Sequence, residues 1–267
     1  MVGRRYAEPI RFAELDWRGK PLRLEYQWVG DAASTRPVVV FLHEGLGSLA
    51  MWKNFPRQLC DAHGLRGLVY SRYGYGQSTP KPPDERWPVD FMHAQAREVL
   101  PALLQQLEIR RPFLFGHSDG GSIALLHGAS HPVAGVVAMA PHILVEDMSI
   151  ASIARARDTY ESTDFAQRLG RYHADADSAF RGWNDVWLDP AFRAWTIEDE
   201  MHRLTCPVLA LQGVDDEYGT LEQIRGIARR APQTRLLEMA QCGHAPHRDQ
   251  PDVVIHEVGR FVDDAHP

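Results

Sequence analysis

Short apolar runs bounded by turn residues recur along most of the chain. Several of them, such as Val38-Val39-Val40-Phe41-Leu42, lack any alternation of polar and apolar positions. Continuous runs of this kind are typical of strands that are buried on both faces of a sheet. Segments 10–15 and 22–28 flank the turn residues Arg18-Gly19-Lys20 and predict an opening hairpin. The further predicted strands are residues 37–42, 67–71, 112–115, 133–139, 207–211 and 234–238.

Helical periodicity lies between the predicted strands. After Asp90, a residue type that favours helix N-caps, apolar residues recur at steps of three and four. They are Met92, Ala96, Val99, Leu100, Leu103 and Leu107. A similar stripe near the end of the chain consists of Val254, Val258, Phe261 and Val262. Because strands alternate with helices, we expect an α/β fold with a mostly parallel central sheet flanked by helices.

Residues 145–203 interrupt this alternation. The segment is polar, favours helices, contains Trp183, Trp187 and Trp195, and has no good strand pattern. We therefore predict a helical cap that is inserted into the core and lies over the carboxyl edge of the sheet. The two parts of the core are then residues 1–144 and 204–267.

Composition and charge narrow the class of protein. The length of 267 residues suits a single α/β unit, and a formal net charge of −6 argues against a nucleic-acid binder, which needs a basic face. Cys60, Cys206 and Cys242 are an odd number without short repeated spacings, which is a poor disulfide framework. No apolar run of the signal-peptide type follows Arg4-Arg5, and no stretch is long enough to cross a bilayer. We expect a cytoplasmic protein with reduced thiols and no membrane partner.

The most informative motif is Gly116-His117-Ser118-Asp119-Gly120-Gly121. It follows the predicted strand 112–115 and precedes the helical residues 122–126. A strand, a sharp turn and a helix are the context of a nucleophile elbow, in which a serine hydroxyl stands above the sheet at a helix N-terminus. The amide of Asp119 there faces a developing oxyanion. The alternative is a glycine-rich turn with an inert serine, which the strand and helix context disfavours.

A serine nucleophile needs a base, and the base needs an acid to orient it. His244 follows the last predicted strand, so its imidazole is expected at the sheet edge that carries Ser118. Asp215, Asp216 and Glu217 stand in a row after the strand 207–211, and the candidates for the orienting acid are Asp216 and Asp215. The acids that do not orient the base fit a solvated acidic loop.

An acyl-transfer site also needs a second oxyanion donor. The loop His43-Glu44-Gly45-Leu46-Gly47-Ser48 directly follows the third predicted strand. Glycine lets the backbone approach a ligand closely. We therefore assign the amide of Gly45 as the partner of the Asp119 amide in an oxyanion hole.

Taken together, these motifs resemble the α/β-hydrolase superfamily, in its serine esterase, lactonase and C–C hydrolase branch. Besides the elbow, the resemblance includes residues 43–48, 71–78, 213–216 and 243–246, and the position of the cap. It implies the chain order of nucleophile, acid and histidine that this family uses. It favours Asp216 over Asp215 as the acid, because Asp216 is the third residue after Gly213, a spacing common in the family.

One position departs from the family pattern. Glu44 stands where a glycine commonly follows the loop histidine. A carboxylate that pointed into the oxyanion hole would oppose negative charge. We therefore expect Glu44 either to point away from the hole or to pair with a cation such as Arg72.

The function implied by the resemblance is hydrolysis of an ester-like bond of a small molecule through a Ser118-His244-Asp216 triad and an acyl-enzyme. This chemistry needs no cofactor. Relatives on the same scaffold hydrolyse C–C bonds, open lactones or carry out perhydrolysis, and these activities stay open. A protein that only binds a small ligand is the alternative from another class. The oligomeric state is also open, with a homodimer among the alternatives.

Several side chains bear on the substrate. Asp119 and Glu44 together would favour a cationic acyl group, whereas the simpler interpretation of Asp119 is a favourable charge at a helix N-terminus. Trp183 and Trp187 are candidates for the wall of an acyl pocket, and ordinary packing of the cap is the alternative. Cys242, His244 and His247 resemble metal ligands, but no fourth ligand has a suitable spacing, so we expect no metal site.

Overall fold

A computed structural model of the protein describes residues 8–266, and the segment that contains Arg4-Arg5 lies outside them. All eight predicted strands are present and form one sheet in the order β1-β2-β4-β3-β5-β6-β7-β8. The strands are β1 (Arg11–Trp17), β2 (Lys20–Gly30), β3 (Val39–Leu42), β4 (Arg66–Tyr70), β5 (Phe113–His117), β6 (Gly135–Met139), β7 (Val208–Gly213) and β8 (Thr234–Met239).

The sheet is antiparallel at one edge and parallel elsewhere. β1 pairs with β2 as the predicted hairpin, and β2 pairs antiparallel with β4. From β4 through β3 and β5 to β8 every pairing is parallel. The central strands β3, β5, β6 and β7 are buried along their whole length, as continuous apolar runs require. The predicted fold class is therefore confirmed.

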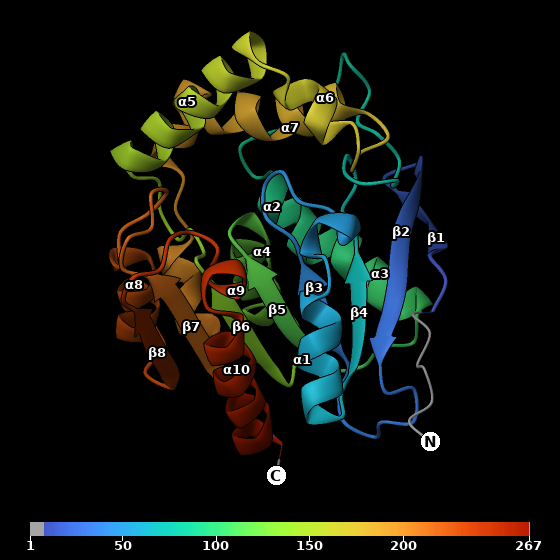
Figure 1. Ribbon diagram of the computed structural model, residues 1–267, viewed down its shortest axis with the longest axis vertical. Coiled ribbons are helices and arrows are strands. Elements are labelled where there is room, and N and C mark those ends of the chain that lie inside the picture. The colour runs from blue at the N-terminus through green and yellow to red at the C-terminus, as the bar shows by residue number, and fades with distance from the viewer. Residues whose placement is uncertain (1–7, 267) are drawn as a thin grey trace.

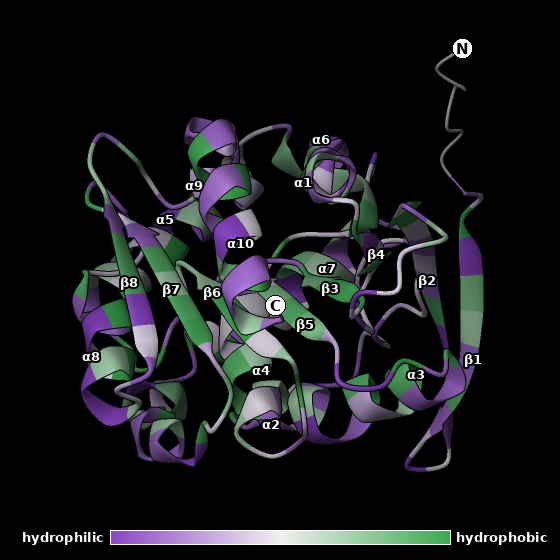
Figure 2. Ribbon diagram, turned by 90° about the horizontal axis from the view of Figure 1, so that it is seen from below, coloured by the Kyte–Doolittle hydropathy of each residue, from purple (hydrophilic) through white to green (hydrophobic). Residues whose placement is uncertain are grey.

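Helices cover both faces of the sheet (Figures 1 and 2). On one face lie α1 (Phe55–His63) and α10 (Pro251–Ala265), and on the other lie α4 (Asp119–Gly128) and α8 (Glu222–Arg230). Apolar side chains form a core against each face, and both cores draw on the strands because successive strand residues point to opposite sides. The short elements η1 (Leu49–Trp52) and α9 (Pro246–Asp249) lie in the loops that follow β3 and β8.

The apolar stripe after Asp90 forms three successive helical segments. They are α2 (Phe91–Ala94), a π-helical stretch η2 (Gln95–Val99) and α3 (Leu100–Gln106). Asp90 occupies the predicted N-cap position, but its side chain makes no capping hydrogen bond. The stripe packs against the sheet as expected, with Met92, Ala96 and Leu103 buried in the core.

Residues 145–203 are helical almost throughout. They form α5 (Asp147–Ser162), α6 (Phe165–Leu169), α7 (Ala176–Trp187), η3 (Pro190–Ala194) and η4 (Glu198–Arg203). The helices α5, α6 and α7 lie together beyond the carboxyl ends of the parallel strands (Figure 1). One antiparallel bridge, between Leu144 and Thr196, closes the base of the segment. Its treatment as a separate cap domain stays a prediction.

Two further findings concern the whole of the described chain. Cys60, Cys206 and Cys242 are all buried and unpaired in the structure. Within residues 8–266, no helix combines the length and the apolar character that a membrane crossing requires.

Candidate active site

The turn between β5 and α4 has the geometry of an elbow. Ser118 lies at its tip with φ 53° and ψ −121°, a conformation that non-glycine residues rarely adopt. A Cβ atom at Gly116 would lie 2.1 Å from the carbonyl oxygen of Gly120, and a Cβ at Gly120 would lie 2.1 Å from that of Leu42. Glycine is therefore required on both sides of the serine, as predicted. The close approach to Leu42 also brings the elbow against the end of β3.

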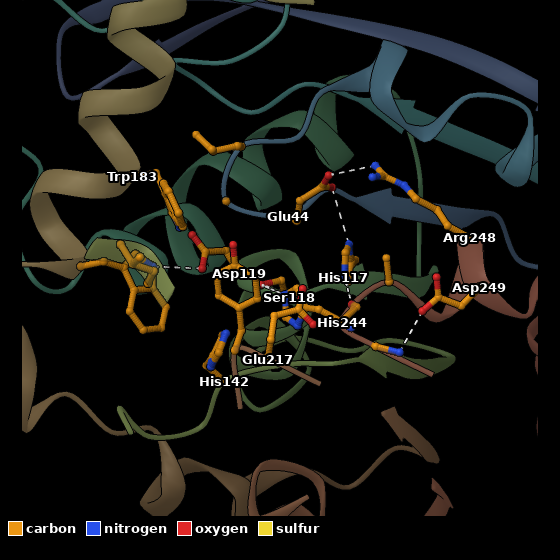
Figure 3. Close-up of a pocket in the computed structure, with 17 residues that line it drawn as sticks. Glu44, His117, Ser118, Asp119, His142, Trp183, Glu217, His244, Arg248 and Asp249 are labelled. Atoms are coloured by element: carbon orange, nitrogen blue, oxygen red, sulfur yellow. Dashed lines mark hydrogen bonds and ion pairs between the residues drawn. The ribbon is translucent and has the colours of Figure 1, made fainter. Parts of the chain in front are cut away.

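Ser118, His244 and Asp216 come from three separate loops and form one hydrogen-bonded chain. His244 Nε2 lies 3.0 Å from Ser118 Oγ, and His244 Nδ1 lies 2.9 Å from both carboxylate oxygens of Asp216. Each residue follows the carboxyl end of a parallel strand, which is why they meet at one edge of the sheet. The structure thus brings the predicted nucleophile, base and acid together (Figure 3 labels Ser118 and His244).

Burial separates the two candidate acids. Asp216 is 6% exposed, whereas Asp215 is exposed and its amide donates to the carbonyl of Cys242. Burial alone would raise the pKa of Asp216. The hydrogen bond and charge of His244 and the amide of Tyr218 outweigh burial, so the pKa of Asp216 is lowered and the carboxylate stays ionised. Asp216 is therefore the acid that can orient the imidazole.

Gly45 and Asp119 both line the space beside Ser118. Asp119 is the first residue of α4, and the first amides of a helix have no partner within the helix. The loop that carries Gly45 is held by Arg72, whose guanidinium donates to the main-chain carbonyl of Glu44 at 2.8 Å. The assignment of both amides to an oxyanion hole stays a prediction.

A cavity of about 310 Å³ opens beside Ser118 between the sheet edge and α7. Trp183 and Trp187, one helical turn apart on α7, both line it, whereas Trp195 packs against Phe192 outside it. Trp183 also lies directly over the loop after β3, because a Cβ at Gly45 would meet its indole nitrogen at 2.2 Å. The cavity size is within the range of small-molecule sites.

The carboxylate of Asp119 is buried in the wall of this cavity. Trp187 Nε1 donates to its Oδ1 at 3.2 Å, while Oδ2 is buried and has no hydrogen-bond partner among the described residues. Burial raises the pKa of Asp119 to about 6, although Arg72 and Trp187 act in the opposite direction. Asp119 also lies in the first turn of α4, so the simpler interpretation as a favourable charge at a helix N-terminus stays open.

Glu44 is turned toward cations at the rim of the cavity (Figure 3). Its carboxylate lies 3.6 Å from His117 Nδ1 and 3.4 Å from Arg248 Nη2. Glu44 therefore pairs with a cation as one of the two expectations had it, but the cation is Arg248 instead of Arg72, whose guanidinium donates to main-chain carbonyls. Burial alone would raise the pKa of Glu44, but His117, His43 and Arg248 hold it well below its ordinary value. Binding of substrate by Glu44 stays a prediction.

The structure adds residues that the motifs did not indicate. His142, three residues beyond the last residue of β6, lines the cavity, and Tyr218 places its ring 4.6 Å from that of His244. The rule that selected His244, a polar residue after a parallel strand, applies equally to His142. The full set of unpredicted cavity residues is Leu46, His117, His142, Ile153, Glu217, Tyr218, Gly243, Ala245, Arg248 and Asp249.

Two acidic side chains accept hydrogen bonds from the loop that carries His244 and hold it in place. Asp249 accepts from the amide of Gly243 at 2.8 Å, and Glu217 accepts from the amide of His244 at 3.3 Å. His117 Nε2 lies 2.7 Å from the carbonyl of His244. Asp249 and Glu217 therefore fix the position of the loop that carries His244. Within residues 8–266, no three histidine, cysteine or acidic side chains are grouped as metal ligands would be.

Comparison with known proteins agrees with this geometry. A family model described as the alpha/beta hydrolase family matches residues 39–257. The chain is similar to the sn-1-specific diacylglycerol lipase ABHD11 of Mus musculus, with 24% identity over 97% of this chain and 93% of that protein. It is 29% identical to the monoglyceride lipase of Mus musculus over 75% of this chain and 76% of that protein. The solved structure of a proline iminopeptidase from Mycobacterium smegmatis superposes with a TM-score of 0.74, at 18% identity, covering 96% of this chain and 98% of that one.

Proposed function

Because the chain belongs to the α/β hydrolase family, we propose that it is a serine hydrolase that cleaves an ester-like bond of a small molecule, whether a carboxylic ester, a lactone or a thioester. The observation that carries the proposal is the hydrogen-bonded chain from Ser118 through His244 to the buried Asp216. The family match and the names of its relatives support hydrolysis in general. Two of those relatives are lipases, which favours an ester as the bond.

The proposed first half-reaction forms an acyl-enzyme. His244 takes the proton of Ser118 as the hydroxyl oxygen attacks the carbonyl carbon, and the amides of Gly45 and Asp119 stabilise the oxyanion. The imidazolium then gives its proton to the leaving alcohol. Asp216 stays ionised and stabilises the imidazolium, because its pKa is lowered in this environment.

The second half-reaction returns the free enzyme. Water enters the cavity, His244 removes its proton, and the resulting oxygen attacks the acyl carbon bound to Ser118. Collapse of the tetrahedral intermediate releases the acid, and the proton returns to the serine oxygen. The mechanism requires neither a metal ion nor a cofactor.

The test is hydrolysis of p-nitrophenyl acetate by the purified protein and its Ser118→Ala variant. We expect multiple turnover by the unmodified protein, labelling of Ser118 by a fluorophosphonate probe, and loss of both in the variant. A loss of only a few-fold would show that the nucleophile is misassigned. Labelling without turnover on a panel of esters, lactones and vinylogous diketones would favour a ligand-binding protein, and turnover of the diketones alone would favour a C–C hydrolase.

The acyl group in this proposal carries a positive charge. Asp119 lines the cavity with one carboxylate oxygen unpaired, whereas Glu44 already forms an ion pair with Arg248. Asp119 is therefore the residue that would select an ammonium group. The Asp119→Asn variant should lose the preference for amino-acyl esters over neutral esters, and an unchanged preference would exclude this role.

A further inference from the structure

His142 is held rigidly at the wall of the cavity. Its amide donates to Ser122 Oγ at 3.0 Å, and Ser122 Oγ donates to its carbonyl at 2.6 Å, which ties the residue to α4 beside the elbow. The ring packs edge-on against Trp187 with 4.8 Å between centroids, and lies 6.0 Å from the ring of His244. Figure 3 shows His142 near Ser118, Asp119 and Glu217, and away from Arg248.

The imidazole of His142 forms no hydrogen bond with the part of the protein that the structure describes. Nδ1 is buried without a hydrogen bond, and neither ring nitrogen bonds to another residue of the described chain. Buried polar groups are normally hydrogen-bonded, so an unpaired imidazole calls for an explanation. The other buried histidine that lacks a partner, His247, does not line the cavity beside Ser118. The remaining buried histidines, His43, His117, His127 and His173, each make a hydrogen bond through a ring nitrogen.

We propose that His142 is a substrate-binding residue whose imidazole forms a hydrogen bond with an uncharged hydroxyl group of the ester. This inference rests on the proposed ester hydrolysis and names a feature of its substrate. The ring lines the cavity that contains Ser118, and its centroid lies 6.0 Å from that of the His244 ring, so both imidazoles border the same space. A hydroxyl group bound there would supply the partner that the protein does not.

The chemistry around His142 favours a hydroxyl over a carboxylate. Burial, with smaller contributions from His244 and His117, lowers the pKa of His142 to about 3, so the ring is neutral at physiological pH. A neutral imidazole offers a carboxylate no opposite charge, and the acidic Asp119 and Glu217 in the same cavity repel one. The neutral ring has one donor and one acceptor nitrogen, and a hydroxyl group can both donate and accept, so it matches either tautomer.

The test compares pairs of esters that differ only in their hydroxyl groups, by one in the butanoate series and by two in the glycerol pair. Methyl butanoate is paired with the methyl esters of 2-, 3- and 4-hydroxybutanoate, and propyl butanoate with glycerol monobutanoate. For each pair, kcat/KM of the hydroxylated ester is divided by that of the plain ester, using acid release by the full-length protein. At least one pair should give a ratio well above one. The His142→Phe variant, which keeps a flat ring, should reduce that ratio about tenfold.

Further variants separate hydrogen bonding from packing. His142→Gln retains a donor and an acceptor and should recover part of the ratio, while His142→Leu should behave like His142→Phe. His127→Phe is the matched control, because His127 is also buried and neutral but bonds to the carbonyl of Ala96 away from the cavity. It should leave the ratio unchanged.

The outcomes distinguish this inference from the proposed function. Ratios near one for every pair, or equal ratios in the unmodified protein and His142→Phe, would overturn the role of His142 while hydrolysis and fluorophosphonate labelling persist. A selective loss on methyl 4-aminobutanoate instead of the hydroxylated esters would also overturn it, in favour of an ammonium ligand. Absence of labelling and of all ester turnover would refute the proposed function itself.

Discussion

Ser118 holds a backbone conformation that costs a non-glycine residue about 1–3 kcal/mol. The surrounding structure imposes it: the Ser118 amide donates to the carbonyl of Met139 at 2.9 Å, and Gly116 and Gly120 remove the clashes on either side. The strain aims the hydroxyl out of the sheet, where His244 reaches it. At the scale of single residues, the site thus depends on a few groups in unusual environments.

Asp216 and Asp215 offer a direct comparison of two neighbouring acids. We expect Asp216→Asn to lower kcat for p-nitrophenyl acetate by about 10³- to 10⁴-fold, because an amide no longer selects the right tautomer of His244 or stabilises its charge. Asp215→Asn is the matched control and should stay within about twofold, as surface substitutions generally do. Steady-state kinetics of both variants checks this. Equal effects would mean that burial and hydrogen bonding identify the wrong acid.

Asp119 should make stability depend on pH. Its pKa is raised from 3.8 to about 6 in the folded protein, so the folded state binds the proton more tightly than the unfolded state does. Stability is therefore lost as pH rises from about 4 to about 6, by roughly 3 kcal/mol in total. Asn does not titrate. The gain in unfolding free energy from Asp119→Asn should then be about 2–3 kcal/mol larger at pH 7.5 than at pH 4.5.

Urea unfolding of both proteins at the two pH values measures this difference. Other titrating groups, such as Asp216, contribute equally to the two proteins and cancel. The same gain at both pH values would show that folding does not raise the pKa of Asp119. It would also remove the argument that an unpaired, buried carboxylate is held there for a ligand.

At the scale of elements, α7 packs closely against the loop after β3. Trp183 lies so close to Gly45 that an added Cβ would be 2.2 Å from its indole nitrogen. Asp175 caps the helix by accepting from the amide of Ser178 at 2.9 Å, which fixes where α7 begins. Trp183 and Trp187 are then four residues apart and face the same cavity. The helix therefore sets the shape of the space above Ser118.

Gly45→Ala should displace the loop or the tryptophan. We expect kcat/KM to fall by about 10- to 100-fold, because small displacements of catalytic groups are costly. Adding Trp183→Leu should restore part of the activity by making room for the methyl group. The control is Gly170→Ala at the C-terminal end of α6, where an added Cβ would meet nothing closer than 3.5 Å. No recovery in the double variant would mean that the contact with Trp183 is not what requires glycine at position 45.

The local pattern of apolar and turn residues predicted most of the strands and helices. All eight predicted strands are found, since continuous apolar runs and turn residues encode a strand buried on both faces. The stripe from Met92 to Leu107 gave one expected helix, but the structure breaks it with a π-helical stretch. Such a stretch changes the hydrogen-bond register without changing which residues are apolar, so periodicity alone does not reveal it.

At the scale of the whole molecule, one sheet separates two apolar cores. Phe115 on β5 is fully buried and its ring lies 5.4–5.8 Å from those of Phe41, Phe55 and Trp52. The cluster joins β3, β5, η1 and α1, which come from distant parts of the chain. The loops that carry the site grow from these same strands, so the rigidity of the core sets the precision of the site.

Phe115→Ala should lower the free energy of unfolding by about 3–5 kcal/mol, through lost burial and the cavity left behind. Leu236→Ala on the edge strand β8, where the side chain is 37% exposed, is the control and should cost less than about 1 kcal/mol. Guanidinium unfolding of both variants gives the comparison. Similar losses would mean that the two sites share the same degree of burial in solution.

The sequence by itself determined the strands, their alternation with helices, the glycines of the elbow and the order of Ser118, Asp216 and His244. These features are encoded locally, by apolar runs, turn chemistry and spacing. Tertiary structure alone decided that Asp216 is buried against His244 while Asp215 is exposed, that Glu44 meets Arg248, and that His142 enters the cavity unpaired. These outcomes depend on where loops from separate strands converge, and no local pattern records the distance between residues far apart in the chain.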